Sequence, residues 1–120
     1  MSGSLKFIMT LTSDKDFSEK VLSAPPEMLS VIDVHAEWCG PCTGLAKRIT
    51  NLSSDFMDYD VQWCEALAEK CTIFADQAAK SRPLFVLYKE GKEVATMNEA
   101  NGNKLEELVK AHATAKQSPD

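Results

Sequence analysis

Two cysteines separated by two residues, Cys39 and Cys42, are the side chains best suited to covalent chemistry. They follow a mostly apolar run, Leu29–His35, which is typical of a strand buried on both of its faces. From Pro41 onward apolar residues recur at helical spacing, so we expect the cysteines where a strand passes into a helix. Free N–H groups and the helix dipole stabilise a thiolate there, which lowers the pKa of the first thiol.

This position predicts a redox-active pair that needs no bound cofactor. We expect the Cys39 thiolate to attack a partner's disulfide, and Cys42, one helical turn onward, to attack Cys39 and release the reduced partner. The alternative is that both cysteines are incidental buried residues. Trp38 before the pair and Gly40 and Pro41 within it favour the redox interpretation.

A zinc site is a further alternative, because cysteine and histidine are its usual ligands. The two other cysteines, Cys64 and Cys71, are widely spaced, and His35 and His112 fall on different predicted elements. We therefore expect no metal site. For Cys64 and Cys71 we favour a structural role over oxidation or glutathione capping.

Composition limits the class of protein. The 120 residues, 44% of them hydrophobic, suffice for one core, and we expect a single domain over residues 1–120. A net charge of -5 with scattered basic residues argues against a nucleic-acid partner. We see no export leader and no membrane-spanning run, so we expect a cytoplasmic protein without a membrane partner.

The hydrophobic pattern along the chain alternates between the periods of strands and helices, and it predicts an α/β fold with a mixed central β-sheet flanked by helices on both faces. The order is β-α-β-α-β-α-β-β-α, and the strand Leu29–His35 should be central. We expect a hairpin turn at Glu90–Lys92 and a frayed polar tail over Ala113–Asp120. The other predicted strands are Leu5–Leu11, Val61–Ala66, Leu84–Tyr88 and Val94–Met97. The predicted helices are a short one after Asp14 that buries Phe17 and Val21, one from Pro41, one over Thr72–Lys80, and a C-terminal one marked by Leu105, Leu108, Val109 and His112.

The segment from Trp38 to Cys42 resembles the active site of the thioredoxin family, and the resemblance extends over roughly Phe7 to Ala111. It implies the thioredoxin fold and a protein-disulfide reductase that acts in electron transport and cell redox homeostasis. The implied partners are disulfide-containing proteins and an electron donor, either thioredoxin reductase or another thiol donor. Gly40 and Pro41 between the cysteines resemble the reducing members of the family.

The resemblance also implies roles outside the cysteine segment. Asp33 matches a buried carboxylate that lies under the second cysteine and helps to move its proton, which is physically reasonable because burial raises the pKa of a carboxyl group. A satisfied buried carboxylate is the alternative. Pro83, after Arg82, matches a cis-proline that faces the dithiol, and Trp38 is a docking surface beside the reactive sulfur.

Several positions depart from the family pattern. Lys47 replaces a proline that kinks the helix, and Arg82 replaces a small or β-branched residue. Glu99 stands where a glycine opens the substrate groove, so we expect substrates to meet Trp38, Arg82, Pro83 and Glu99. His35 replaces an aromatic residue, and we expect Trp63 where a lysine near the buried aspartate is common.

These departures favour a second hypothesis, which is a binding module. The pattern resembles divergent thioredoxin-like subunits such as the light chains of axonemal outer-arm dynein. This resemblance implies a redox-sensitive subunit in a cilium or flagellum, with the dynein heavy chain as partner. The intact Cys39, Cys42 and Asp33 favour the enzyme, whereas the altered docking residues favour the module.

Overall fold

Strand β2, Leu29–His35, lies at the centre of a five-stranded sheet with the order β1-β3-β2-β4-β5. The computed structural model describes residues 8–35, 46–79 and 84–116. The strand β2 has the predicted bounds. Its central position is confirmed.

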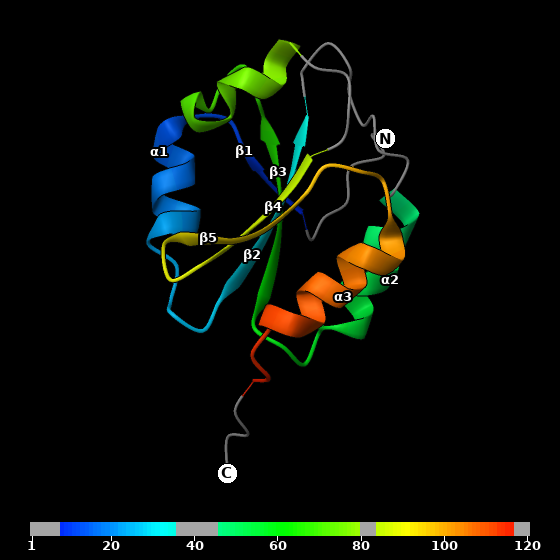
Figure 1. The fold of residues 1–120 in the computed structure, drawn as a ribbon. Coiled ribbons are helices and arrows are strands. Elements are labelled where there is room, and N and C mark those ends of the chain that lie inside the picture. The colour runs from blue at the N-terminus through cyan, green and yellow to red at the C-terminus, as the bar shows by residue number, and fades with distance from the viewer. Residues whose placement is uncertain (1–7, 36–45, 80–83, 117–120) are drawn as a thin grey trace, which may run out of the picture.

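The sheet is mixed, as predicted (Figure 1). Strands β1 (Ile8–Leu11) and β3 (Val61–Leu67) run parallel to each other and to β2. Strand β4 (Leu84–Lys89) runs antiparallel to β2, and β5 (Lys92–Met97) antiparallel to β4. Strand β5 begins two residues before the predicted start, because pairing with β4 continues up to the turn.

That turn is the predicted hairpin. Glu90 and Gly91 both have positive φ angles, 56° and 73°. Two consecutive left-handed residues form the tight turn whose twist matches the flanking strands.

Helices cover both faces of the sheet, as predicted (Figure 1). On one face lie α1 (Asp14–Phe17), the π-helix η1 (Ser18–Leu22) and the 3-10 helix η2 (Thr72–Ala79). On the other lie α2 (Ala46–Asp55) and α3 (Gly102–His112). The first helix was expected as one short helix, and it instead changes from α to π geometry while burying Phe17 and Val21.

The alternation of β2 supplies apolar residues to two cores. Ile32 and Val34 face the α1 side, where Phe17 makes edge-to-face contacts with Phe74 and Tyr88. Leu29 and Val31 face the α2 and α3 side. The core on that side also contains the buried residues Ile49, Leu52, Phe56, Phe85, Leu87, Met97, Leu105 and Val109.

The predicted frayed tail, Ala113–Asp120, is wrong as far as Lys116. The backbone N–H of Asp60 donates to the Thr114 carbonyl at 2.8 Å, and that of Lys116 donates to the Asp58 carbonyl at 2.9 Å. The loop before β3 has backbone groups that need partners, and this polar stretch provides them. A hydrophobicity pattern does not detect such pairing.

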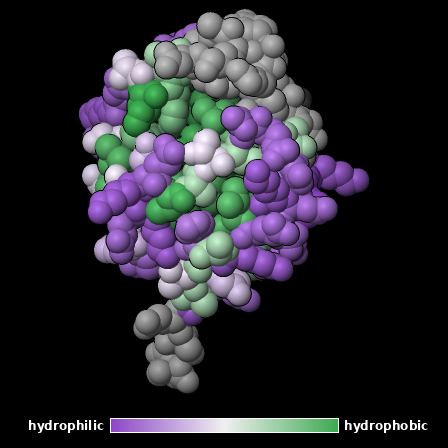
Figure 2. Space-filling model, viewed as in Figure 1, coloured by the Kyte–Doolittle hydropathy of each residue, from purple (hydrophilic) through white to green (hydrophobic). Residues whose placement is uncertain are grey.

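Polar side chains dominate the face of the molecule seen in Figure 2, with separate hydrophobic areas between them. No helix among residues 8–35, 46–79 and 84–116 is long and apolar enough to cross a membrane.

Helix α3 packs on the sheet through Leu105 and Val109, which are both fully buried. Leu105 is fully buried, so Leu105→Ala should lower the free energy of unfolding by about 2–5 kcal/mol through lost burial and a cavity. Leu22 is 41% exposed, so Leu22→Ala should lower the free energy of unfolding by less than about 1 kcal/mol. Guanidinium unfolding measures both, and equal losses would contradict this description of the core.

Candidate active site

A row of polar side chains crosses the α2 and α3 side of the sheet. Asp33 and His35 alternate onto that face of β2. The strand register places Glu65 of β3 opposite Asp33 on one side and Phe85 of β4 opposite it on the other. Thr10 of β1 lies opposite Glu65. The row therefore spans three strands on a face that is otherwise largely apolar.

Glu65 is held on both of its carboxylate oxygens. His35 Nε2 lies 3.2 Å from Oε1, and the Thr10 hydroxyl donates to Oε2 at 2.9 Å. The hydrogen bond from His35 is the main cause that lowers the pKa of Glu65, and the bond from Thr10 lowers it further. Glu65 is thus an ionised acceptor, and Nε2–H of His35 donates to it. The side chain of His35 is only 10% exposed, and that of Glu65 is 36% exposed.

Asp33 has a different environment. Its Oδ1 atom is buried and has no hydrogen-bond partner within the described ranges. Burial raises the pKa of Asp33 to about 6, while the charge of His35 lowers it and that of Glu65 raises it. Asp33 therefore takes up or releases a proton close to neutral pH. Buried polar atoms without partners are uncommon and often mark functional sites.

Most of the predicted site lies outside the described residues. These are Trp38, Cys39, Gly40, Pro41, Cys42, Arg82 and Pro83. The described strands define the edge of the sheet to which both segments connect. Val34 lies opposite Leu84, so the carboxyl end of β2 and the amino end of β4 are adjacent, with Asp33 beside them.

Glu99 lies at the same edge. Phe85 pairs with Asp33 on one side and with Met97 on the other, so β5 ends at the edge where β2 ends. Glu99 follows two residues after Met97 and is about half exposed. Its carboxylate forms an ion pair with Lys104 at 3.0 Å. Its carboxylate is therefore held by the first turn of α3.

The prediction for Trp63 is wrong. Trp63 lies opposite Val31 and is buried in the core, and the residue opposite Asp33 is Glu65. Sequence reasoning missed Glu65. The period of two along β3 puts Trp63 and Glu65 on one face, but only the register between β2 and β3 decides which of them lies opposite Asp33.

Cys64 and Cys71 are buried free thiols, in line with the structural role expected of them. Burial raises the pKa of Cys64 to about 12. Burial is also the main cause that raises the pKa of Cys71, whose sulfur lies 3.7 Å from the carbonyl oxygens of Leu11 and Ser13. Neither is suited to nucleophilic attack. Within the part of the chain that the structure describes, no cluster of three or more Cys, His, Asp or Glu side chains is arranged to hold a metal.

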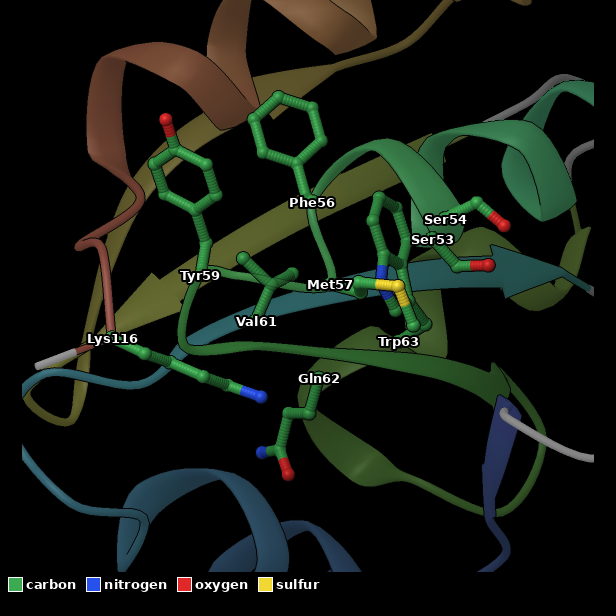
Figure 3. A pocket seen from close by; sticks show the side chains of 9 residues that line it. All are labelled: Ser53, Ser54, Phe56, Met57, Tyr59, Val61, Gln62, Trp63 and Lys116. Atoms are coloured by element: carbon green, nitrogen blue, oxygen red, sulfur yellow. The ribbon is translucent and has the colours of Figure 1, made fainter. Parts of the chain in front are cut away.

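A pocket of about 460 Å³ lies beside the end of α2 (Figure 3). It includes Val61–Trp63, at the amino end of β3, whereas Glu65 lies further toward the carboxyl end. This pocket is therefore separate from the edge that carries Asp33. Its other lining residues are Ser53, Ser54, Phe56, Met57, Tyr59 and Lys116.

The mixed sheet, with helices on both faces, has the thioredoxin fold. It superposes on the crystal structure of the thioredoxin of Fasciola hepatica with a TM-score of 0.69 and 30% sequence identity, over 87% of this chain and 98% of that one. The family model "Thioredoxin" matches residues 8–111, and the chain belongs to the thioredoxin family.

Two relatives show the range of the family. The thioredoxin of Mus musculus is 30% identical over 113 residues, which cover 88% of this chain and 100% of that protein. A 14 kDa dynein light chain of the flagellar outer arm of Chlamydomonas reinhardtii is 25% identical over 105 residues, which cover 88% of this chain and 81% of that protein. Family membership supports thiol-disulfide oxidoreductase chemistry, which needs no cofactor.

Asp33 should make stability depend on pH. Its folded pKa of about 6 lies above the ordinary value of 3.8, so its stabilising contribution is full below pH 3.8 and is lost as the pH rises to about 6. Asp33→Asn should therefore raise the free energy of unfolding at pH 7.5 by about 1–3 kcal/mol and flatten the dependence between pH 4 and pH 6.

Urea unfolding at several pH values measures both effects. Glu27→Gln, at an exposed carboxyl group, serves as the control and should leave the pH dependence unchanged. A variant Asp33→Asn that keeps the wild-type slope between pH 4 and pH 6 would show that Asp33 is not the titrating group.

Proposed function

We propose that this chain is a protein-disulfide reductase that uses Cys39 and Cys42 as its redox pair. The observation that carries the proposal is the environment of Asp33. The carboxyl group of Asp33 has a pKa of about 6, and its buried Oδ1 atom has no hydrogen-bond partner in the described part of the chain; it stands on the central strand, two residues before that strand ends at His35. The Cys-Gly-Pro-Cys segment follows His35 closely in the sequence.

The reaction proceeds in two exchanges. The Cys39 thiolate attacks one sulfur of the partner's disulfide, which forms a mixed disulfide and releases the partner's other sulfur as a thiolate. Asp33 then accepts the proton of Cys42, and the Cys42 thiolate attacks the Cys39 sulfur. The partner leaves with two thiols after proton uptake. The chain retains a Cys39–Cys42 disulfide, so two electrons have passed to the partner.

A thiol donor must return the pair to the dithiol form. This step requires thioredoxin reductase or another thiol donor as partner. The two cysteines carry the electrons themselves, so the reaction uses no bound cofactor. Arg82, Pro83 and Trp38 belong to the proposed docking surface, together with Glu99. The cytoplasm is the location proposed for this activity, because reducing conditions keep the pair available.

Reductase activity can be tested with insulin as substrate. With NADPH and a generic thioredoxin reductase, the wild-type chain should reduce insulin disulfides, and Cys39→Ser should lose at least about 99% of the rate because it lacks the nucleophile. Cys64→Ala, at a buried thiol on β3, should retain the rate. Turnover by Cys39→Ser equal to that of the wild type would overturn the proposal.

A second candidate function is a binding subunit of a larger assembly, such as a light chain of outer-arm dynein in a ciliary or flagellar axoneme. The light-chain relative from Chlamydomonas reinhardtii supports it. So does Glu99, whose carboxylate is fixed by Lys104 at the edge of the sheet near Asp33. A fixed charge there restricts the range of partners more than a glycine would.

One experiment can distinguish binding to the assembly from redox catalysis. Purified axonemes depleted of outer-arm dynein light chains are incubated with the wild-type chain and with Cys39→Ser. If the chain is a subunit, both should bind with similar affinity, and Glu99→Lys should bind at least about tenfold more weakly because its charge is reversed. Failure of the wild-type chain to bind the axonemes or an isolated dynein heavy chain would exclude this function.

A further inference from the structure

The Glu65–His35 pair lies beside Asp33, but the proposed reaction gives it no role. Glu65 is fixed by Thr10 at 2.9 Å and by His35 at 3.2 Å, and the strand register places it directly opposite Asp33. Side chains held on both oxygens in this way keep a defined position. Asp33 therefore has a negative neighbour at a constant place on β3 and a histidine two residues away on its own strand.

Among residues 8–35, 46–79 and 84–116, the other elements bring no titratable side chain to the immediate neighbourhood of Asp33. From β4 the neighbour of Asp33 is Phe85, which is fully buried. From β1 it is Thr10, beyond Glu65. The buried residues of α2 and α3 on this side are apolar, and the partly exposed Arg48 of α2 and Glu106 of α3 form an ion pair with each other at 2.8 Å.

We propose that the Glu65–His35 pair controls when Asp33 gains and loses its proton, acting through its two charges and not through contact with the dithiol. A protonated His35 favours the ionised carboxyl group of Asp33, and the Glu65 carboxylate disfavours it. Both residues are positioning residues for the reaction. The inference rests on the proposed function in one respect, namely that Asp33 accepts the proton of Cys42.

The two charges have opposite signs, so their effects on Asp33 oppose each other. In the wild-type chain burial is the largest single cause of the raised pKa, and the pair contributes one lowering and one raising effect. When the charge of His35 alone is removed, the raising effect of Glu65 on the pKa of Asp33 is no longer opposed. Removing both charges restores the balance. This compensation, in which the single variant shifts the midpoint and the double variant restores it, distinguishes control by charge from a general structural disturbance.

The test is an NMR titration of Asp33 in the full reduced chain labelled with ¹³C-aspartate. In His35→Gln the amide still donates to Glu65 but carries no charge, so the midpoint of Asp33 should rise by about 0.5–1 pH unit. In His35→Gln with Glu65→Gln it should return to within about 0.3 unit of the wild type. If His35→Gln does not fold, His35→Asn takes its place with the same expectation.

Two control variants complete the design. Glu107→Gln removes an exposed charge from α3 and should leave the midpoint unchanged. Thr10→Val removes a hydrogen bond to Glu65 but neither charge, so it should shift the midpoint less than His35→Gln does. Equal midpoints in His35→Gln and Glu107→Gln, or a double variant that shifts further than the single one, would overturn the proposal. The titration needs no turnover, so its outcome is independent of the insulin assay.

Discussion

Burial of β2 on both faces is the constraint on which the rest of the structure depends. The strand contributes Ile32 and Val34 to one core and Leu29 and Val31 to the other. A carboxyl group placed on such a strand loses most of its water, and Asp33 occupies that place. Its raised pKa is therefore a direct consequence of the sheet order, in which β2 has a paired strand on each side and helices above and below.

The same physical effect has opposite consequences for different groups. Desolvation brings the pKa of Asp33 to about 6, where a carboxyl group can exchange a proton near neutral pH. It brings the pKa of the Cys64 thiol to about 12, where almost no thiolate exists. Burial thus brings Asp33 on β2 into the pH range of acid–base chemistry, and it keeps Cys64 on the neighbouring strand β3 protonated and unreactive. In our proposal the charge pair of Glu65 and His35 then adjusts the electrostatic field at Asp33.

Much of the fold could be predicted because hydrophobic periodicity reports on burial. Side-chain type alone predicts the strand Leu29–His35 and the hairpin turn. It also predicts the buried helix face with Ile49, Leu52 and Phe56. Interactions that depend on the register between distant strands could not be predicted in this way. Glu65 is such a case, because its place beside Asp33 follows from pairing between β2 and β3.

Two other misses have different causes. The change from α1 to the π-helix η1 rests on backbone hydrogen bonds of i to i+5 type, such as that from Ser23 N–H to the Ser18 carbonyl, which the spacing of apolar residues does not specify. The ordered residues before Lys116 depend on backbone hydrogen bonds to Asp58 and Asp60. Of the candidate site, the place of Asp33 on the central strand could be predicted, because the strand pattern of Leu29–His35 includes it. The roles of Cys39 and Cys42 remain a prediction.

The most direct measurement of the central claim is the rate at which Cys42 resolves a mixed disulfide on Cys39, followed by stopped-flow fluorescence between pH 5 and pH 8. If Asp33 accepts the proton of Cys42, the rate in the wild-type chain should rise as the pH passes about 6, where Asp33 ionises. Asp33→Asn should lose that rise and be at least about tenfold slower at pH 7. Identical profiles for the two chains would contradict the claim that the buried carboxyl group serves the dithiol.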